Sequence, residues 1–332
     1  LVGFMSNQSE FVGYNFKGSS FDVLLDVLAY NTHYNAYYAN MIANEMFLDS
    51  ATLRNSVVAR AKHLGYRPRS AQGSLAAVTL TITPTDNPAS ISIPKQTQFQ
   101  GEVAGISYIW CTTNSHSVNI NANGVYTVSD VTLTQGIPST FRYTANTGDI
   151  DQQFIIPNAN VDTSTLAVTV QNSSSDSTVF TYTDGNAVDV TTIKGTDKVF
   201  FLQEVEAGKF EVYFGDGVVS KAISDGNIVL LTFVATNKEL ANGASTFTNT
   251  GAIDGETDIT VTTVASADGG GERETLASIK LNAPLDFAAQ GRCVTVNDYK
   301  VFARKLFPQT KSVQVFGGED GSFDSSLGVV ST

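Results

Sequence analysis

Hydrophobic positions along the chain follow a helical period over residues 19–65 and a period of two from about residue 74 to 265. Ser19 and Asp22 have the spacing of a capping box before the first helix. The second helix places apolar residues at helical spacing, at Leu53, Val57, Ala61 and Leu64. Gly65 follows as a stop. The pattern predicts an N-terminal helical hairpin.

Residues with a period of two alternate apolar side chains such as Val78, Leu80 and Ile82 with threonines. Further β-branched and aromatic runs are separated by Gly, Asn, Asp and Ser clusters, which predicts a mostly antiparallel β domain. Helices return after residue 271, and 312–316 is predicted as a strand.

We therefore expect an α+β fold divided into residues 1–70, 71–266 and 267–332, the last being the start of an α/β domain. The final residues, "SSLGVVST", end within a predicted β element. We expect this C-terminal domain to be truncated.

The first helix is apolar over more of its circumference than packing on one body requires, since a stripe of about 100° suffices for that. Its polar stripe is narrow and consists of Asp22, Asp26, His33, Asn40 and Asn44. The candidate interface residues are Val23, Val27, Tyr30, Tyr34, Tyr37, Tyr38 and Met41. We expect this side to meet a partner subunit, because tyrosine is enriched at interfaces, and Leu24, Leu28 and Ile42 to pack on the second helix. An internal helix wholly covered by the β domain would give the same pattern.

Two glycine-rich strings suggest ligand sites but have simpler interpretations. Gly269, Gly270 and Gly271 precede a helix as phosphate loops do, yet Glu272 and Glu274 follow where a phosphate would bind, which favours a flexible hinge and an acid-capped helix. "FGDG" at 214–217 could bind a cation or form a turn, and we favour the turn because calcium takes about six to eight oxygens.

Composition and charge argue against several classes of partner. The chain has 20 Lys+Arg against 32 Asp+Glu, a net charge of -12, which opposes nucleic-acid and anionic-membrane partners. A local basic patch, expected to face an acidic protein, comprises Arg54, Arg60, Lys62, Arg67 and Arg69. No run approaches the roughly 20 apolar residues of a membrane span. Cys111 and Cys293 are expected to be reduced structural thiols.

Motifs for chemistry are missing. The three histidines have no ligand partners at metal spacing, no nucleophile elbow occurs, and no particular carboxylate pair is marked. We therefore predict no catalytic, metal or cofactor site.

Several strings together resemble a known family. The segment from "FKGSSFDVLLDVLAY" to "KHLGYRP" closely resembles the N-terminal part of the baseplate wedge subunit of contractile-tailed bacteriophages, of the baseplate J-like family. "IPKQTQF" at 93–99, "FEVYFGDG" and "NAPLDFAAQGRCVTVNDYK" are similar to later motifs of that family. Gln96 stands where the family usually has glycine, which puts the local turn in question. In order and spacing, these strings cover nearly the whole chain.

The resemblance implies a structural protein of the virion tail baseplate, assembled in the host cytoplasm. It implies contacts with a second copy, with other wedge subunits and with a sheath-initiating protein, in a ring that rearranges when the sheath contracts. It also implies that a further set of residues forms the framework of the fold, namely Gly215, Asp216, Gly217, Pro284, Gln290, Arg292, Thr295 and Asp298. The alternative is a carbohydrate- or receptor-binding β module of a tail adhesin, and a wall-degrading hydrolase comes third.

Overall fold

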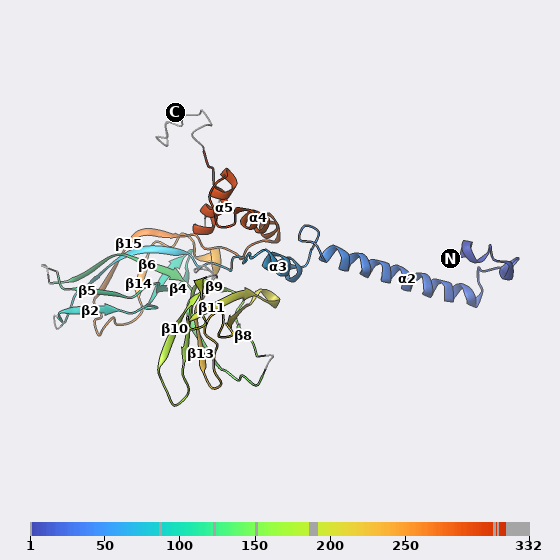
Figure 1. Ribbon diagram of the computed structural model, residues 1–332. Coiled ribbons are helices and arrows are strands. Elements are labelled where there is room, and N and C mark those ends of the chain that lie inside the picture. The colour runs from blue at the N-terminus through green and yellow to red at the C-terminus, as the bar shows by residue number, and fades with distance from the viewer. Residues whose placement is uncertain are drawn as a thin grey trace.

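The computed structural model describes residues 2–85, 88–121, 124–149, 152–185, 192–307, 310 and 312–316. The molecule has a long helical arm, two β bodies and a small helical layer where they meet (Figure 1). This arrangement confirms the predicted α+β class.

The N-terminal region is helical, as predicted, but it does not fold back as a hairpin. Its elements are α1 (Val2–Met5), η1 (Ser9–Phe11), α2 (Ser20–Glu45) and α3 (Arg54–His63). Ser19 caps α2, since its Oγ accepts a hydrogen bond from the Asp22 amide at 3.3 Å. Gly65 follows α3 with φ 75°, the left-handed conformation that ends helices. The arm α2 points away from α3 and the β bodies (Figure 1).

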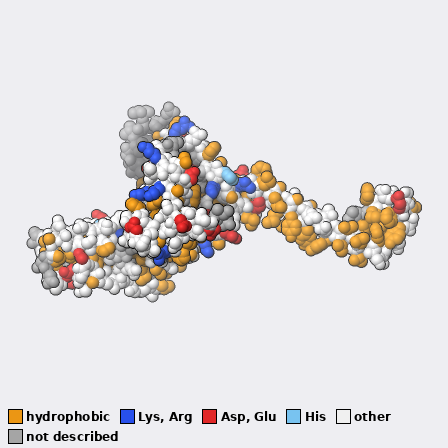
Figure 2. Space-filling view, turned by 60° about the horizontal axis from the view of Figure 1, so that its bottom comes forward, with side chains coloured by type: hydrophobic (Ala, Val, Ile, Leu, Met, Phe, Trp, Pro, Cys, Tyr) orange, Lys and Arg blue, Asp and Glu red, His pale blue; other side chains and the backbone are white. Residues whose placement is uncertain are grey.

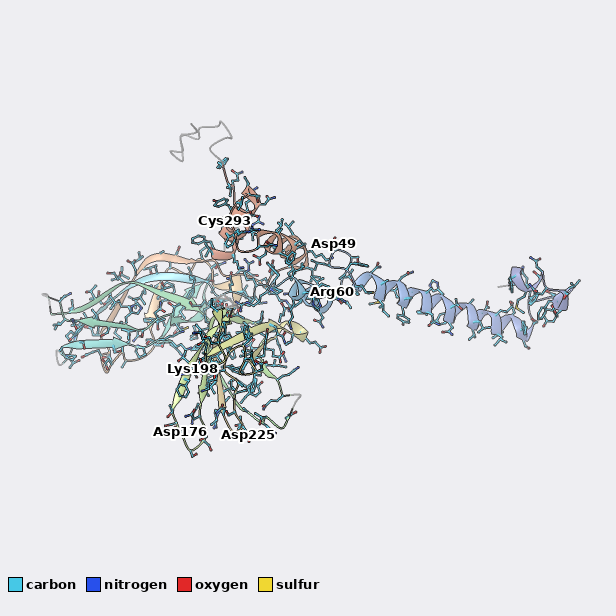
Figure 3. The ribbon with its side chains drawn as sticks, viewed as in Figure 1. Asp49, Arg60, Asp176, Lys198, Asp225 and Cys293 are labelled. Carbon is cyan, nitrogen blue, oxygen red and sulfur yellow. The ribbon has the colours of Figure 1, made fainter. Side chains whose placement is uncertain are left out.

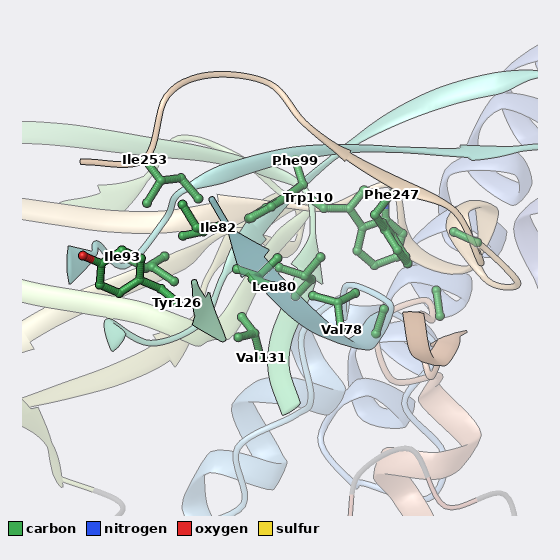
Figure 4. Packing of buried hydrophobic residues seen from close by; sticks show 14 of the residues in the cluster. Val78, Leu80, Ile82, Ile93, Phe99, Trp110, Tyr126, Val131, Phe247 and Ile253 are labelled. Carbon is green, nitrogen blue, oxygen red and sulfur yellow. The ribbon is translucent and has the colours of Figure 1, made fainter. Parts of the chain in front are cut away.

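The first β body is a six-stranded sheet in the order β14-β3-β4-β6-β1-β15, with a two-stranded sheet β2-β5 beside it. The strands are β1 (Leu75–Ile82), β2 (Ser90–Ile93), β3 (Gln98–Val103), β4 (Ile106–Thr112), β5 (His116–Asn119), β6 (Tyr126–Gln135), β14 (Phe247–Asn249) and β15 (Ile259–Asp268). Val78, Leu80 and Ile82 of β1 are fully buried, so the predicted alternation holds there. They pack with Trp110 and Phe247 in one core (Figure 4).

Gln96 lies in the turn before β3 with φ 69°. The turn forms although a side chain occupies a conformation that favours glycine.

The second β body is a seven-stranded sheet with its own core, in the order β7-β13-β9-β10-β11-β12-β8. Its strands are β7 (Ile137–Thr144), β8 (Phe154–Ile156), β9 (Val161–Gln171), β10 (Val179–Asp184), β11 (Val199–Glu204), β12 (Phe210–Phe214) and β13 (Ile228–Ala235). Only β10 and β11 pair in parallel among the described strands, through Thr183 and Val199. The predicted β-rich region thus contains two cores.

One residue, Gly136, separates β6 of the first body from β7 of the second. A Cβ at this glycine would lie 2.6 Å from the carbonyl oxygen of Ala235, so no side chain fits. Beside it, Gln135 Nε2 donates to Asn237 Oδ1 at 2.8 Å and Gln135 Oε1 accepts from Thr236 Oγ1 at 2.9 Å. The chain passes between the two β bodies at Gly136 and again after residue 235. These hydrogen bonds therefore join the two connections.

Helices α4 (Leu276–Ala289) and α5 (Val296–Leu306) follow the β bodies. Ile279 and Ala283 of α4 pack on Val57 and Ala61 of α3 in a third core. Thr295 and Asp298 form the capping box that their spacing predicts. Residues 312–316 have no regular structure, so the strand predicted there is wrong. "SSLGVVST" lies outside the described residues.

The triple glycine is a bonded junction, and the flexible hinge predicted there is wrong. A Cβ on Gly270 would lie 2.2 Å from the Lys238 carbonyl oxygen, and Gly271 and Gln72 exchange two backbone hydrogen bonds of 3.0 and 3.1 Å. The helix behind it is capped by the hydroxyl of Thr275 rather than by an acid. Glu274 is instead buried.

Candidate assembly interface

The arm α2 is exposed along nearly its whole length. Of its 26 residues, all of them described, only Leu25 is buried. The candidate interface residues are all exposed, namely Val23, Val27, Tyr30, Tyr34, Tyr37, Tyr38 and Met41. Apolar side chains follow the arm from its base to its tip (Figure 2). The structure therefore brings these residues together on one helix and leaves them uncovered.

The second apolar side of α2 is also exposed. Leu24, Leu28 and Ile42 are 51%, 47% and 66% exposed. The expectation that they pack on α3 is wrong, and so is the alternative of an internal helix covered by the β domain. The physical reason is the loop 46–53, which turns α2 away from α3, α4 and the β bodies (Figure 1).

The tyrosines of α2 touch one another along the helix. The rings of Tyr30 and Tyr34 have centroids 4.4 Å apart, and those of Tyr34 and Tyr38 are 6.1 Å apart. A hydrogen bond to Tyr34 raises the pKa of Tyr30. Contacts at i and i+4 preorder these side chains, which lowers the entropy lost when a partner covers them.

An aromatic cluster closes the tip of the arm. The chain before α2 folds back so that Phe11, Tyr14, Phe16 and Phe21 meet, with ring centroids of Tyr14 and Phe16 4.9 Å apart. Phe16 is buried, as is Leu25. The first turns of α2 are thus fixed by local packing.

Glu45, the last residue of α2, fixes the loop that joins the arm to α3. Its Oε1 accepts hydrogen bonds from the Thr52 amide at 2.8 Å and the Thr52 hydroxyl at 2.7 Å, and it also accepts from the Leu53 amide at 3.3 Å. These bonds, the Thr52 amide first and a Ser56 hydroxyl bond next, lower the pKa of Glu45 to about 2. Leu53, the N-cap residue of α3, offers no side-chain cap, and Glu45 accepts its backbone amide as the acid of a capping box does.

The same loop is tied to α4. Lys280 Nζ donates to the carbonyl oxygen of Asp49 at 2.8 Å, and Ser50 Oγ donates to that of Asn44 at 2.6 Å. Asp49 lies at the base of the arm, near α3 and α4 (Figure 3). Ala51 is fully buried in the core shared by α3 and α4. The loop is therefore a fixed elbow.

Arg54, the first residue of α3, anchors the elbow to the second β body. Its Nε and Nη2 donate to the two carboxylate oxygens of Glu204 on β11 at 2.6 and 3.0 Å, and its Nη1 donates to the Glu274 carbonyl oxygen at 2.6 Å. The side chains of Arg54 and Glu204 are 17% and 2% exposed. This two-point geometry is the strongest form of an ion pair between side chains.

Other residues of the basic patch are also engaged within the chain. Arg67 pairs with Asp184 at 2.8 Å, and Lys62 donates to Gln203. The expectation that the patch faces an acidic neighbour is therefore wrong for Arg54, Arg67 and Lys62. These three residues instead join α3 and the segment after it to the second β body. The sequence pattern singled out Arg54 but not Glu204 or Glu45, because only the folded chain brings these two carboxylates to their partners.

Glu274 is a second buried junction. Its carboxylate accepts hydrogen bonds from the Tyr66 hydroxyl at 2.8 Å, the Ser278 hydroxyl at 2.6 Å and the Arg69 amide at 3.1 Å. Burial, and then the charge of Glu274, raises the pKa of Tyr66 well above its ordinary value. These bonds join the segment after α3 to the start of α4.

The framework residues lie in a turn after β12, inside α4 and at the helix ends that follow it. Asp216 Oδ1 accepts from the amides of Val218 and Val219 at 2.9 and 3.1 Å, which lowers the pKa of Asp216. A Cβ on Gly215 would lie 1.7 Å from the Val219 carbonyl oxygen, and Gly217 has φ 89°. This geometry is that of a turn.

Three more framework residues lie in α4 and in the turn after it. Pro284 lies inside α4, and Gln290 ends that helix in the left-handed conformation. Arg292 Nη2 donates to Gln290 Oε1 at 2.9 Å.

Among the described residues, no three His, Cys, Asp or Glu side chains are grouped to hold a metal ion. No helix in the described ranges is long and apolar enough to span a membrane. Cys111 is buried with a raised pKa of about 11, caused by burial, and Cys293 is exposed.

The helical N-terminal region and the second β body both resemble domains of known proteins. Residues 1–66 match the family model "Baseplate wedge protein gp6-like, helical domain", and residues 141–259 match "Bacteriophage baseplate wedge protein gp6, third domain". The chain is 29% identical to baseplate wedge protein gp6 of Enterobacteria phage T4 over 352 aligned positions. That alignment covers 95% of the chain and 50% of the T4 protein, so the chain spans about half the length of this relative.

One solved structure with a distant likeness is a chain of the cryo-EM structure of the anti-feeding prophage baseplate, 6-fold symmetrised. It is 14% identical with a TM-score of 0.25, and the match covers 90% of this chain and 60% of that one. The two family models and the T4 relative lead to one conclusion: the chain belongs to the baseplate wedge proteins of contractile-tailed bacteriophages and is a structural protein of the virion tail baseplate.

Proposed function

We propose that α2 assembles the wedge, pairing with a second copy through its tyrosine side and meeting other wedge subunits through its Leu24, Leu28 and Ile42 side. A sheath-initiating protein is a further proposed partner. The chain acts in this proposal as a scaffold without enzymatic activity. The observation that carries the proposal is the exposure of apolar side chains over both sides of α2.

An exposed helix of this composition is stabilised by little within its own chain. Isolated helices are marginal in water, and most helical stability in proteins comes from covering an apolar face. At about 1.5 Å per residue, α2 offers an apolar surface about 39 Å long. Such a surface on a soluble protein is typical of a subunit interface.

The tyrosine side suits a second copy because it is uncharged. None of its seven residues is Lys, Arg, Asp or Glu, so a symmetric pair brings no like charges together. The carboxylates of α2 are Asp22 and Asp26 on the polar stripe and Glu45 in the elbow.

The elbow supports a role in transmitting the rearrangement that accompanies sheath contraction. Glu45 holds α2 to the start of α3, and Arg54 holds that start to β11 and to the segment before α4. A displacement of the arm therefore acts on the second β body and on α4 through fixed bonds.

The adhesin alternative is not favoured by the β bodies. Among described residues, their largely exposed aromatic side chains are Phe141 and Tyr213, which lie in strands β7 and β12 rather than in loops.

Three charge substitutions test the assembly role. Tyr34→Asp should abolish self-association, since loss of a central interface side chain costs about 2 kcal/mol or more, and an uncompensated charge adds to this. Leu28→Asp should leave self-association intact and prevent co-purification with other wedge subunits. Asn40→Asp, on the polar stripe, is the matched control. Sedimentation and co-purification of each variant are the measurements.

Thermal melting of the isolated chain should be the same for all three variants, because each position is exposed. Self-association that survives Tyr34→Asp would overturn the assignment of the tyrosine side. Self-association lost in all three variants would show that added charge alone prevents assembly.

A further inference from the structure

Two lysines of the second β body meet over one aromatic ring. Lys198 Nζ lies 3.8 Å from the centroid of the Phe180 ring, and Lys221 Nζ lies 5.3 Å from it. Phe180 belongs to β10, and Lys198 comes directly before β11 in the second β body (Figure 3). The two ammonium groups are therefore within about 9 Å of each other, and their like charges repel.

The second β body supplies these lysines with no counter-charge. Residues 137–235 contain five Lys or Arg and twelve Asp or Glu, so carboxylates outnumber basic groups there. Among the described residues, however, no carboxylate forms an ion pair with Lys198 or Lys221. Asp197, the carboxylate nearest in sequence, instead accepts a hydrogen bond from the Lys194 amide at 2.8 Å. The pair thus consists of two uncompensated positive charges, of which Lys198 is half-buried and Lys221 is exposed.

A buried serine fixes the backbone that carries both lysines. Ser220 is fully buried with φ 66°, a left-handed conformation that is uncommon for residues other than glycine. Its Oγ donates to the Val199 carbonyl oxygen at 2.5 Å and accepts from the Val199 amide at 3.3 Å. The amide of Lys221 donates to the Asp197 carbonyl oxygen at 2.8 Å. Strained backbone of this kind persists where the surrounding structure fixes it, and it is concentrated at functional sites.

The chemistry of the pair suits carboxylates. Hydrogen bonds from an ammonium group to a carboxylate are shorter and stronger than those between neutral groups. The Phe180 ring, which packs against the core of the second β body, holds Lys198 through a cation–π contact. Less side-chain entropy is then lost when a ligand binds. A segment with neighbouring carboxylates can reach both ammonium groups, which favours an acidic peptide over a single small anion.

A symmetric contact with a second copy would not supply this ligand. An isologous interface places the same surface on both sides of its two-fold axis. Centred on this site, such an interface would bring together Lys198 and Lys221 of both copies, four positive charges. Charge complementarity therefore favours a different protein.

We propose that Lys198 and Lys221 bind an acidic segment, one with neighbouring Asp or Glu side chains, of another protein. The site lies on the second β body, and its occupation does not depend on how α2 assembles.

The test uses the full chain and three probes. The first is a short peptide of four consecutive glutamates, the second has glutamine in place of glutamate, and the third is inorganic phosphate. Binding is followed by the side-chain ammonium resonances of Lys198 and Lys221 at low ionic strength, where exposed charges are least screened. The glutamate peptide should shift both resonances with one saturation curve, the glutamine peptide should shift neither, and phosphate should bind more weakly than the glutamate peptide.

Lys198→Gln and Lys221→Gln should each weaken binding of the glutamate peptide by about twofold to fivefold. Lys17→Gln makes the same charge change on the arm, where Lys17 is exposed, and should leave binding unchanged. Three results obtained with the probes would overturn the proposal: no shift with the glutamate peptide, equal weakening in Lys17→Gln, or binding of phosphate as tight as that of the peptide. Shifts without any probe that grow with protein concentration would also overturn it, because the occupant would then be a second copy.

Discussion

Helices α2 and α3 are neighbours in the chain but differ in where their apolar surface is covered. Helix α3 buries Val57, Val58 and Ala61 among its 10 residues. Helix α2 buries Leu25 alone among 26. The difference shows that α3 is covered inside its own chain, whereas α2 is left exposed, as the proposed assembly role requires.

The strongest test of this contrast is the link that fixes α3. Arg54→Met should lower the free energy of unfolding by about 3–5 kcal/mol, because it leaves the buried Glu204 carboxylate without its partner. Urea unfolding followed by tryptophan fluorescence and circular dichroism is the measurement.

An exposed ion pair gives the control for Arg54. Lys305 and Asp286 lie 3.4 Å apart with the lysine side chain 62% exposed, so Lys305→Met should cost less than about 1 kcal/mol. Equal losses of unfolding free energy in the two variants would show that Arg54 contributes no more to stability than an exposed ion pair does.

Shortening one side chain on each helix compares their packing directly. Val57→Ala should cost about 2 kcal/mol, since Val57 is fully buried against α4. Tyr34→Ala removes a larger side chain from α2 and should change the stability of the free chain by less than about 0.5 kcal/mol. Melts of the unassembled protein decide the matter, and a greater loss for Tyr34→Ala would mean that α2 is already covered.

Limited proteolysis compares local opening of the two regions. A broad-specificity protease should cut first between Tyr14 and Phe47, at least about tenfold faster than elsewhere, a difference of about 1.4 kcal/mol, because few tertiary contacts hold the arm. The division into 1–70, 71–266 and 267–332 stays a proposal. First cuts at 267–271 would show that the glycine junction opens despite its hydrogen bonds.

The smallest expected effect concerns the elbow. The pKa of Glu45 is lowered to about 2 from an ordinary 4.5, so its bonds stabilise the folded elbow above the ordinary value and are lost as pH falls toward 2. The Thr52 amide resonance should therefore shift with a midpoint near 2. In Glu45→Gln this transition should vanish, and a midpoint near 4.5 in the parent protein would contradict the bonds to Thr52.

Local patterns were sufficient to predict several helix ends and the burial pattern of a strand. Ser19, Gly65 and the Thr295–Asp298 capping box mark helix ends through bonds within a few residues, and these predictions are confirmed. The alternation of Val78, Leu80 and Ile82 likewise reports burial on one face.

Long-range geometry was not predictable from those patterns. An apolar stripe shows that a side of a helix needs covering but not by which body, so Leu28 was wrongly assigned to α3. A basic residue shows a charge but not its partner, so Arg54 was assigned to a neighbour rather than to Glu204, 150 positions away. Periodicity likewise gives no strand order, and the two cores of the β region emerge only from pairing.

The single residue between β6 and β7 sets a rule for altering the chain. No side chain fits at Gly136, and no other residue separates β6 from β7. A residue inserted there would therefore not simply lengthen the connection between the two strands. It would displace β6 or β7 by one position and turn every side chain of that strand to the opposite face. The hairpin loop at 173–177, exposed at the far tip of the second body near Asp176 (Figure 3), has no such coupling. Foreign peptides for display on the baseplate would be better tolerated in that loop.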